Sequence, residues 1–431
     1  MVNQQMLSFN LTRHFHSLLG FNSDHKIIRK AITRFNSVSL YTFMLKNGCR
    51  QHQSSSSLPN FTLKLLTIRL LVLIMAIRYT ILTFSNHTSS VHTFLGNPFY
   101  LFSSSPIFNG LMLAYLVFLN FCREYWLYLE SKGCLEFLTQ LFVIHDHGFS
   151  RHLLALSLLQ SNRFKRLASF CLIYWFKNIH PFYYSLIPLF MALHAANPFM
   201  WSNSIYFVAS SIWCLIEISI FLISVNSLVI SYCIAFIFTS LYVSRLTTLT
   251  EQLSTLAIHQ QSSDCRREVE SINRLFISFS NDFDEKTRIF RYFSFLFFMG
   301  MSITMDVSIF LGLIIKIHSP LVTYLLSFSG LASLVASTAI IFLLSKFWNQ
   351  FNRFCGCYSA LMAQAGDFTL NIQQKLKILY ILERCSYNGV RIGDLCFIQK
   401  SLIIHFFLEN ASTILLLVVN LRSLQDGSYK G

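Results

Sequence analysis

Long apolar stretches separated by polar and basic segments dominate the hydrophobic pattern of this 431-residue chain. A helix needs about 20 mostly apolar residues to cross the ~30 Å hydrocarbon core of a bilayer. We expect seven such helices, over residues 65–84, 106–121, 168–193, 205–241, 293–315, 321–344 and 397–421. The fourth is too long for one perpendicular crossing, so we expect it to tilt and to project beyond the bilayer. The pattern predicts an all-α, polytopic membrane protein with seven transmembrane helices.

Composition supports this class and excludes others. Hydrophobic residues make up 54% of the chain, with 44 Phe, and charged residues make up 12%, against about 25% in ordinary soluble domains. So few charges do not cover the surface of a soluble globule, and a disordered chain does not hold so much Phe, Leu and Ile.

The basic residues predict the orientation, because cytoplasmic loops retain Lys and Arg. Of the 34 Lys and Arg, 28 fall in segments on one side of the predicted spans and 3 on the other, alternating loop by loop. We therefore expect a cytoplasmic amino terminus and an extracellular carboxyl terminus. Because the positive charge is divided among four short cytoplasmic segments, it forms no continuous basic face, and we expect membrane lipid rather than nucleic acid as its partner.

Outer-loop features fit the same orientation. No cysteine falls in an outer loop, which implies no disulfide framework. Asn86 heads the sequon Asn86-His87-Thr88 in the first outer loop, where a glycan is expected.

Two cytoplasmic segments have helical spacing of apolar residues. Residues 25–45 place Ile28, Ile32 and Phe35 opposite a basic face, which indicates either an interfacial helix on anionic lipid or a poorly ordered tail. Residues 370–384 are expected to form an amphipathic helix that ends near Asn388-Gly389.

Catalytic chemistry has little support. The densest cluster of potential metal ligands is His145-Asp146-His147 with His152. This segment is either a solvated loop or a metal site. We find no nucleophile elbow, phosphate-binding loop or dinucleotide fingerprint, and we expect no enzyme, no cofactor and no metal. A zinc-dependent membrane hydrolase or receptor of adiponectin-receptor type is the alternative, but the last span offers one histidine, His405, where that class needs a pair.

The last span resembles the closing signature of arthropod gustatory receptors. It reads Thr413-Ile414, five apolar residues, then Asn420-Leu421, where that family has Thr-Tyr, five hydrophobic residues and Gln-Phe. Upstream, residues 393–397 (GDLCF) look like the family's glycine-led entry into this helix. The chain is similar to a divergent member of the gustatory and odorant receptor group of seven-helix ligand-gated ion channels.

This resemblance implies a chemosensory, non-selective cation channel in the plasma membrane of sensory neurons. It implies a small-molecule tastant as ligand and other receptor subunits, in a homo- or heterotetramer, as partners. The implied organisation is a cytoplasmic basic segment (1–60), helices 1–6 with cytoplasmic extensions (61–344), a cytoplasmic anchor segment (345–395), a pore-lining helix (396–421) and an extracellular tail (422–431). In the family, the anchor segment carries most of the subunit contacts.

The last span carries a polar stripe that suits a pore. At 100° per residue, one face alternates amides and a hydroxyl with bulky apolar groups, and Glu409 flanks it. The predicted pore and gate residues are Gln399, Phe406, Glu409, Asn410, Thr413, Leu417, Asn420 and Leu421. By position in the motif, Leu417 and Leu421 correspond to the apolar gate, which blocks ions by dewetting. Hydrogen bonds between helices of one subunit are the other explanation of these polar groups.

Two further acids lie within spans, where buried charge is expensive and indicates function or internal pairing. Glu217 and Asp306 have similar depths below the outer face, and both are candidates to border a ligand pocket. Arg69 and Arg78 lie near opposite ends of the first span, and we expect them to extend to the membrane surface. The aromatic candidates for the pocket are Tyr183, Tyr184, Tyr206, Trp213 and Tyr324.

Overall fold

The structure is a computed structural model, and it confirms a nearly all-helical chain. It describes residues 25–49, 61–85, 90–100, 105–175, 187–188, 190–258, 265–315, 320–364, 371–386, 389–394 and 396–428. Within these ranges, six helices are long and apolar enough to cross a membrane. The expected third span lies partly outside them, since residues 176–186, with Lys177, are not among the described residues.

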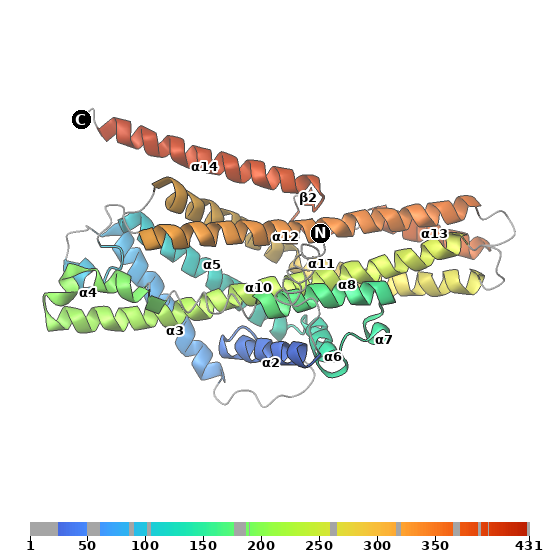
Figure 1. The fold of residues 1–431 in the computed structure, drawn as a ribbon, viewed down its shortest axis with the longest axis horizontal. Helices are drawn as coiled ribbons and strands as arrows, with labels where there is room; N and C mark the ends of the chain where they lie inside the picture. Colours follow the sequence, from blue (N-terminus) through green and yellow to red (C-terminus); the bar gives the residue numbers. More distant parts are fainter. Residues whose placement is uncertain are drawn as a thin grey trace, which may run out of the picture. The chain divides into compact units, whose positions relative to one another are not determined.

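The elements follow one another along the chain as labelled in Figure 1. The α-helices are α2 (His25–Tyr41), α3 (Phe61–Phe84), α4 (Ser90–Phe94), α5 (Ser105–Ser131), α6 (Thr139–His147), α7 (Arg151–Leu154), α8 (Leu158–Ser169), α10 (Ser204–Ile258), α11 (Cys265–Ile309), α12 (Pro320–Gln364), α13 (Ile372–Ser386) and α14 (Ser401–Ser428). Short 3-10 helices are η1 (Glu136–Leu138) and η3 (Pro198–Trp201), π-helices are η2 (Phe170–Trp175) and η4 (Phe310–Ile315), and the strands are β1 (Arg391–Ile392) and β2 (Cys396–Phe397).

The chain divides into two compact units, each described by itself. The first comprises Met1–Ser150 and Lys165–Ile234, and the second comprises Arg151–Phe164 and Ala235–Gly431. In the first unit, α3 packs along α5. Met75, Tyr79 and Leu82 of α3 form an apolar cluster with Leu116 of α5 and Ile220 of α10.

Helix α2 differs from both sequence-based expectations for its segment. Ile28, Ile32 and Phe35 are fully buried, because α2 packs against α6 and η2 rather than on lipid. His145 of α6 is buried there and lies 3.2 Å from the hydroxyl of Thr33. The segment around His145 is therefore a helix that holds α2, not a solvated loop, and within the described ranges no group of three or more His, Cys, Asp or Glu is arranged to hold a metal ion.

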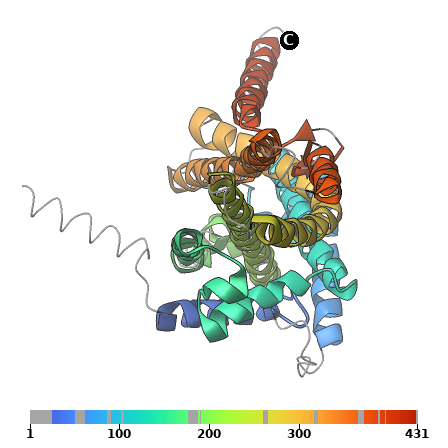
Figure 2. The same cartoon turned by 90° about the vertical axis from the view of Figure 1, so that its right-hand side faces the viewer.

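In the second unit, α11 and α12 lie side by side (Figures 1 and 2), joined by a ladder of phenylalanines. The Phe276 and Phe354 rings stack with centroids 4.3 Å apart, and the Phe283 and Phe347 rings stack at 4.6 Å. The many Phe residues of the composition thus build much of the core of this unit.

Helix α10 is longer than the predicted fourth span. The expected span ends at residue 241, but the helix continues to Ile258. Leu246 and Leu253 in this extension are fully buried in the same core as the phenylalanine ladder. Most of the expected cytoplasmic segment 242–292 is therefore helix, because its apolar residues recur at helical spacing and bury against α11 and α12.

A two-stranded hairpin separates α13 from α14. Strands β1 and β2 pair antiparallel, and Gly393 between them has φ +55°, a left-handed conformation that glycine adopts without strain. The last helix therefore begins at Ser401 rather than near residue 396, and it runs to Ser428. Gln399 precedes the helix, so its predicted place on the helical stripe is wrong.

Candidate functional site

The first unit contains a buried ion pair between Arg78 of α3 and Glu217 of α10. The Arg78 Nη1 and Glu217 Oε2 atoms are 2.9 Å apart, and the side chains are 1% and 2% exposed. The expectation that Arg78 extends to the membrane surface is wrong, because its charge is neutralised inside the helix bundle, which removes the need for water.

Every polar group of this pair has a partner. Glu217 also accepts hydrogen bonds from the Tyr79 hydroxyl and from His194 Nε2 at 3.1 Å. Because the ionised carboxylate only accepts, Nε2 is the donor nitrogen, and His194 Nδ1 in turn lies 3.2 Å from the Ser210 hydroxyl. The Arg78 guanidinium donates to the carbonyls of Leu95 (2.8 Å) and Gly96 (2.7 Å).

Gly96 shapes the loop that supplies these carbonyls. Its φ is +58°, and a Cβ atom at this position would lie 3.0 Å from the Cα of Ser210. A side chain would therefore strain the backbone and push the loop from α10, so glycine lets the carbonyl reach Arg78.

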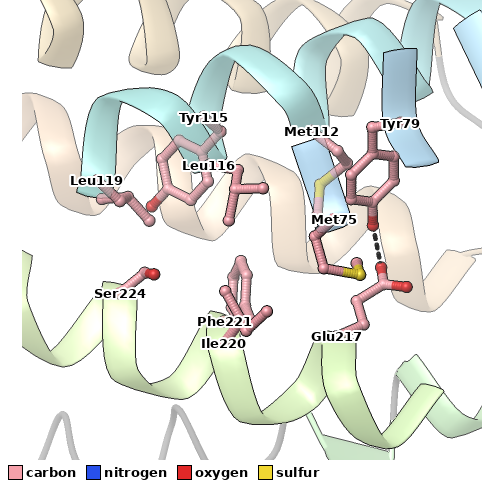
Figure 3. A pocket seen from close by; sticks show the side chains of 10 residues that line it. All are labelled: Met75, Tyr79, Met112, Tyr115, Leu116, Leu119, Glu217, Ile220, Phe221 and Ser224. Carbon is pink, nitrogen blue, oxygen red and sulfur yellow. Dashed lines mark hydrogen bonds between the residues drawn. The ribbon is translucent and has the colours of Figure 1, made fainter. Parts of the chain in front are cut away.

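A small cavity extends from Glu217 between α3, α5 and α10. Its volume is about 20 Å³, room for about one water molecule. Figure 3 shows the Tyr79–Glu217 hydrogen bond at one end and Ser224 and Tyr115 toward the other. The lining residues are Met75, Tyr79, Met112, Tyr115, Leu116, Leu119, Glu217, Ile220, Phe221 and Ser224. The arrangement offers a small apolar space with a few polar groups, far below the volume of about 300 Å³ or more that small-molecule sites usually have.

Among the predicted pocket residues that the structure describes, Glu217 alone lines this cavity. Trp213 instead covers the Arg78 guanidinium, 5.2 Å from ring centroid to Cζ. Tyr206 is half-buried, and Tyr324, in the second unit, is exposed. Tyr183, Tyr184 and the glycosylation candidate Asn86 lie outside the described residues.

Sequence reasoning missed Tyr79, His194 and the methionines of the cavity. The signal for His194 was a titratable side chain beside the outer end of a span, but nothing in the sequence paired it with Glu217, 23 residues away. Asp306, the other predicted acid, is buried in α11 of the second unit. Whether Glu217 or Asp306 contacts a ligand stays a prediction.

Helix α14 is the predicted pore helix, and most of its side chains are uncovered in the single chain. Large apolar residues such as Phe407, Leu408 and Leu415 are exposed. Asn410 is the exception, at 4% exposed, because its Oδ1 accepts a 2.6 Å hydrogen bond from Ser302 of α11 and its Nδ2 donates to the Phe406 carbonyl.

The centre of the predicted stripe therefore faces the subunit's own helices. Phe406 and Leu417 are half-buried on the same side as Asn410, whereas Glu409 and Thr413 on the flank are exposed. Asn410 serves as a contact between helices here, the explanation that competed with the pore. Asn420 and Leu421 belong to α14, but their side chains lie outside the described part of the chain.

The start of α14 is anchored to α11 through the hairpin. Arg291 Nε donates to the Gly393 carbonyl at 2.6 Å, and the Gly393 amide donates to the Arg291 carbonyl at 3.1 Å. An ion pair between Arg291 and Asp394 adds to this contact.

The long apolar helices, their helical extensions and the last helix together define the fold that comparison with solved structures can test. No family model matches the sequence, and no characterised protein matches it by sequence comparison. The chain is similar to the solved structure of the insect olfactory receptor OR5 from Machilis hrabei in complex with eugenol, with a TM-score of 0.63 and 13% identity over 92% of this chain and 99% of that one. It is also similar to the structure of the same receptor described without eugenol, with a TM-score of 0.62 and 13% identity over the same shares. The likeness shows that this chain has the insect olfactory receptor fold.

Proposed function

We propose that this protein is a gustatory-receptor-like chemosensory channel, a non-selective cation channel opened by an external small molecule. The observation that carries the proposal is the insect olfactory receptor fold over 92% of the chain, combined with a last helix that is apolar and largely uncovered. A zinc-dependent hydrolase of adiponectin-receptor type is not favoured, because the chain has the fold of a receptor instead.

Four copies would cover the apolar surfaces that the single chain leaves bare. Helix α13 buries Ile378 and Ile381 in its own unit but exposes Ile372, Leu376 and Leu379. These three residues recur at i, i+4 and i+7, one face of a helix. The position of α13 in the cytoplasmic segment 345–395 supports its role as the anchor between subunits, and α14 of each subunit would face the shared axis.

The pore face of α14 is the flank that carries Glu409 and Thr413, with Asn420 on the same side by helical spacing. Glu409 would favour cations over anions, and the neutral hydroxyl and amide would replace water around an ion without a strong field. Weak discrimination among monovalent cations follows. Leu417 and Leu421 lie about 20° on either side of Asn410 around the helix, so their proposed role as the gate requires α14 to turn away from α11 until this side reaches the shared axis.

The ligand site is the cavity beside Glu217. An opening ligand has to displace flexible side chains, since about 20 Å³ holds no odorant-sized molecule. Met75 and Met112 are suited to this, because unbranched thioether side chains repack readily. The plasma membrane of sensory neurons, a cytoplasmic amino terminus and assembly with itself or another subunit belong to the same proposal.

Cation current through cells that express this chain tests the proposal. Leu421→Ala should give a leak current without ligand, because a smaller ring no longer excludes water. Leu415→Ala, which is exposed and about 120° from Leu421 around the same helix, is the matched control and should stay closed. A chain that reaches the membrane and assembles but carries no current with Leu421→Ala, or under a broad panel of tastants, would contradict the channel assignment.

A further inference from the structure

Asp306 is a buried acid without a counter-charge among the described residues. Its side chain is 3% exposed, and its Oδ1 atom is fully buried and accepts no hydrogen bond. Glu217, by contrast, receives three donors. A carboxyl group left in this way in apolar surroundings is costly, and such a group in a membrane helix indicates a functional site.

Two further oxygen-bearing side chains lie beside Asp306. Ser302 precedes it by four residues on α11, which places the two about 40° apart around the helix and about 6 Å apart along it. Ser302 contacts Asn410 of α14, with 2.6 Å between Oγ and Oδ1. The carboxylate, the hydroxyl and the amide carbonyl therefore belong to one sector between α11 and α14.

Helix α12 also packs against α11, next to this sector. Gly330 of α12 approaches Met305 and Ile309, since a Cβ on Gly330 would lie 3.3 Å from the Met305 carbonyl oxygen and 2.7 Å from Ile309 Cγ1. With Asp306 as the reference, Ser302 is about 40°, Ile309 about 60° and Met305 about 100° away in the same direction around the helix. Asp306 is therefore on the side of Ser302 that is away from α12. Four residues beyond Asp306 the helix widens into the π-helix η4, a deviation that is frequent at functional sites.

We propose that Asp306, Ser302 and Asn410 form a binding site for a singly charged cation between α11 and α14. Oxygen ligands of these three kinds suit a hard cation, and an ammonium group donates hydrogen bonds to the same atoms. The occupant is therefore either a metal ion such as Na⁺ or the protonated amine of a small molecule. In either case the cation neutralises Asp306 and bridges α11 to the last helix.

The purified full-length protein in detergent tests this proposal through its unfolding temperature, a readout that does not depend on channel activity. Na⁺ is titrated against the bulky N-methylglucammonium ion at constant chloride, and hexylammonium is compared with hexanol. A ligand that binds only the folded state raises the unfolding temperature with concentration. A rise with Na⁺ identifies a metal-ion site, and a rise with hexylammonium but not hexanol identifies an amine site.

Variants assign the effect to these residues. Asp306→Asn should abolish the dependence on the cation, whereas Glu268→Gln, an exposed acid on the same helix, should keep it. If Asp306→Asn fails to fold, Ser302→Ala tests the same site, because this variant retains the acid. It should raise the half-saturating cation concentration about fivefold, which corresponds to the loss of one contact as strong as a hydrogen bond. A wild-type protein that responds to neither cation, or a Ser302→Ala protein with unchanged half-saturation, overturns the proposal.

Discussion

Arg78 and Glu217, 139 residues apart in the sequence, form an ion pair that is removed from solvent on both sides. The pair joins α3 to α10, and His194 and Tyr79 complete the hydrogen bonds of the carboxylate. Removing one member of such a pair destabilises the fold strongly, because the charge of the other member stays buried without a partner.

Glu217→Ala should therefore destabilise the folded protein by about 3–5 kcal/mol. The measurement is the unfolding temperature and the yield of assembled protein in detergent. Glu270→Gln, which removes an exposed pair with Arg274, is the control and should cost no more than about 0.5 kcal/mol. The double variant Arg78→Met/Glu217→Leu should recover most of the loss, and a double variant as unstable as Glu217→Ala would argue against this account.

Phe221 tests the ligand cavity. Phe221→Ala enlarges the space beside Glu217, so bulkier agonists should become about tenfold more potent relative to small ones. A tenfold change is the discrimination that one or two methylene groups give in an apolar pocket. Concentration–response curves of cation influx measure this. Leu215→Ala changes an exposed residue on the same helix and should leave the ranking unchanged, and an unaltered ranking for Phe221→Ala would move the ligand site elsewhere.

The flank of α14 predicts which positions meet water in the pore. Thr413→Cys should react with a charged thiol reagent about tenfold or more faster than Asn410→Cys, because only a wetted thiol ionises and reacts, and Asn410 is buried against α11. Block of ligand-gated current is the readout, with the unsubstituted chain as background. Equal reaction rates at the two positions would indicate that Asn410 also faces water in the proposed pore.

The exposed face of α13 predicts the assembly. Leu376→Glu places a charge on this face and should dissociate the proposed tetramer, since burial of one leucine side chain contributes about 1.5–3 kcal/mol and the substitution recurs in every subunit. Light scattering of the purified protein measures the mass. Gln373→Glu, exposed on the same helix, should leave the tetramer intact, and a tetrameric Leu376→Glu protein would place the contact on another surface.

Cys49 should be chemically inert. Burial, with a smaller contribution from the Glu130 carboxylate, raises the pKa of its thiol from 9.0 to about 12, so its thiolate population near pH 7 falls about a thousandfold. Cys134, which is partly exposed, provides the internal comparison. Peptide mass spectrometry after brief maleimide treatment should find Cys134 labelled and Cys49 unlabelled, and equal labelling would mean that the segment before α3 opens readily.

Hydropathy predicted the membrane helices well where length and apolar content alone decide. The span expected at 65–84 is α3 at Phe61–Phe84, and the one expected from 293 ends with η4 at Ile315. The extension of α10 to Ile258 was missed, because Leu246 and Leu253 lie among polar residues and a hydropathy average does not register their spacing.

Tertiary partners were beyond the reach of the sequence. The meeting of Arg78 with Glu217 depends on how α3 and α10 pack, whereas the position of Arg78 near one end of its span had predicted that it extends to the membrane surface. On α14 the periodicity located a polar stripe, but helical spacing does not distinguish a face toward water from a face toward a neighbouring helix. The bond between Ser302 and Asn410 makes that distinction for the centre of the stripe.

The contact between Arg291 and Gly393 gives α14 a fixed pivot. Leu421 lies 20 residues beyond Ser401 on one continuous helix, about 30 Å along its axis. A tilt of about 5° at the hairpin therefore swings the backbone at Leu421 sideways by about 2.6 Å. A displacement too small to disturb the contacts of Arg291 with Gly393 can therefore move the far end of α14 by more than the length of a carbon–carbon bond.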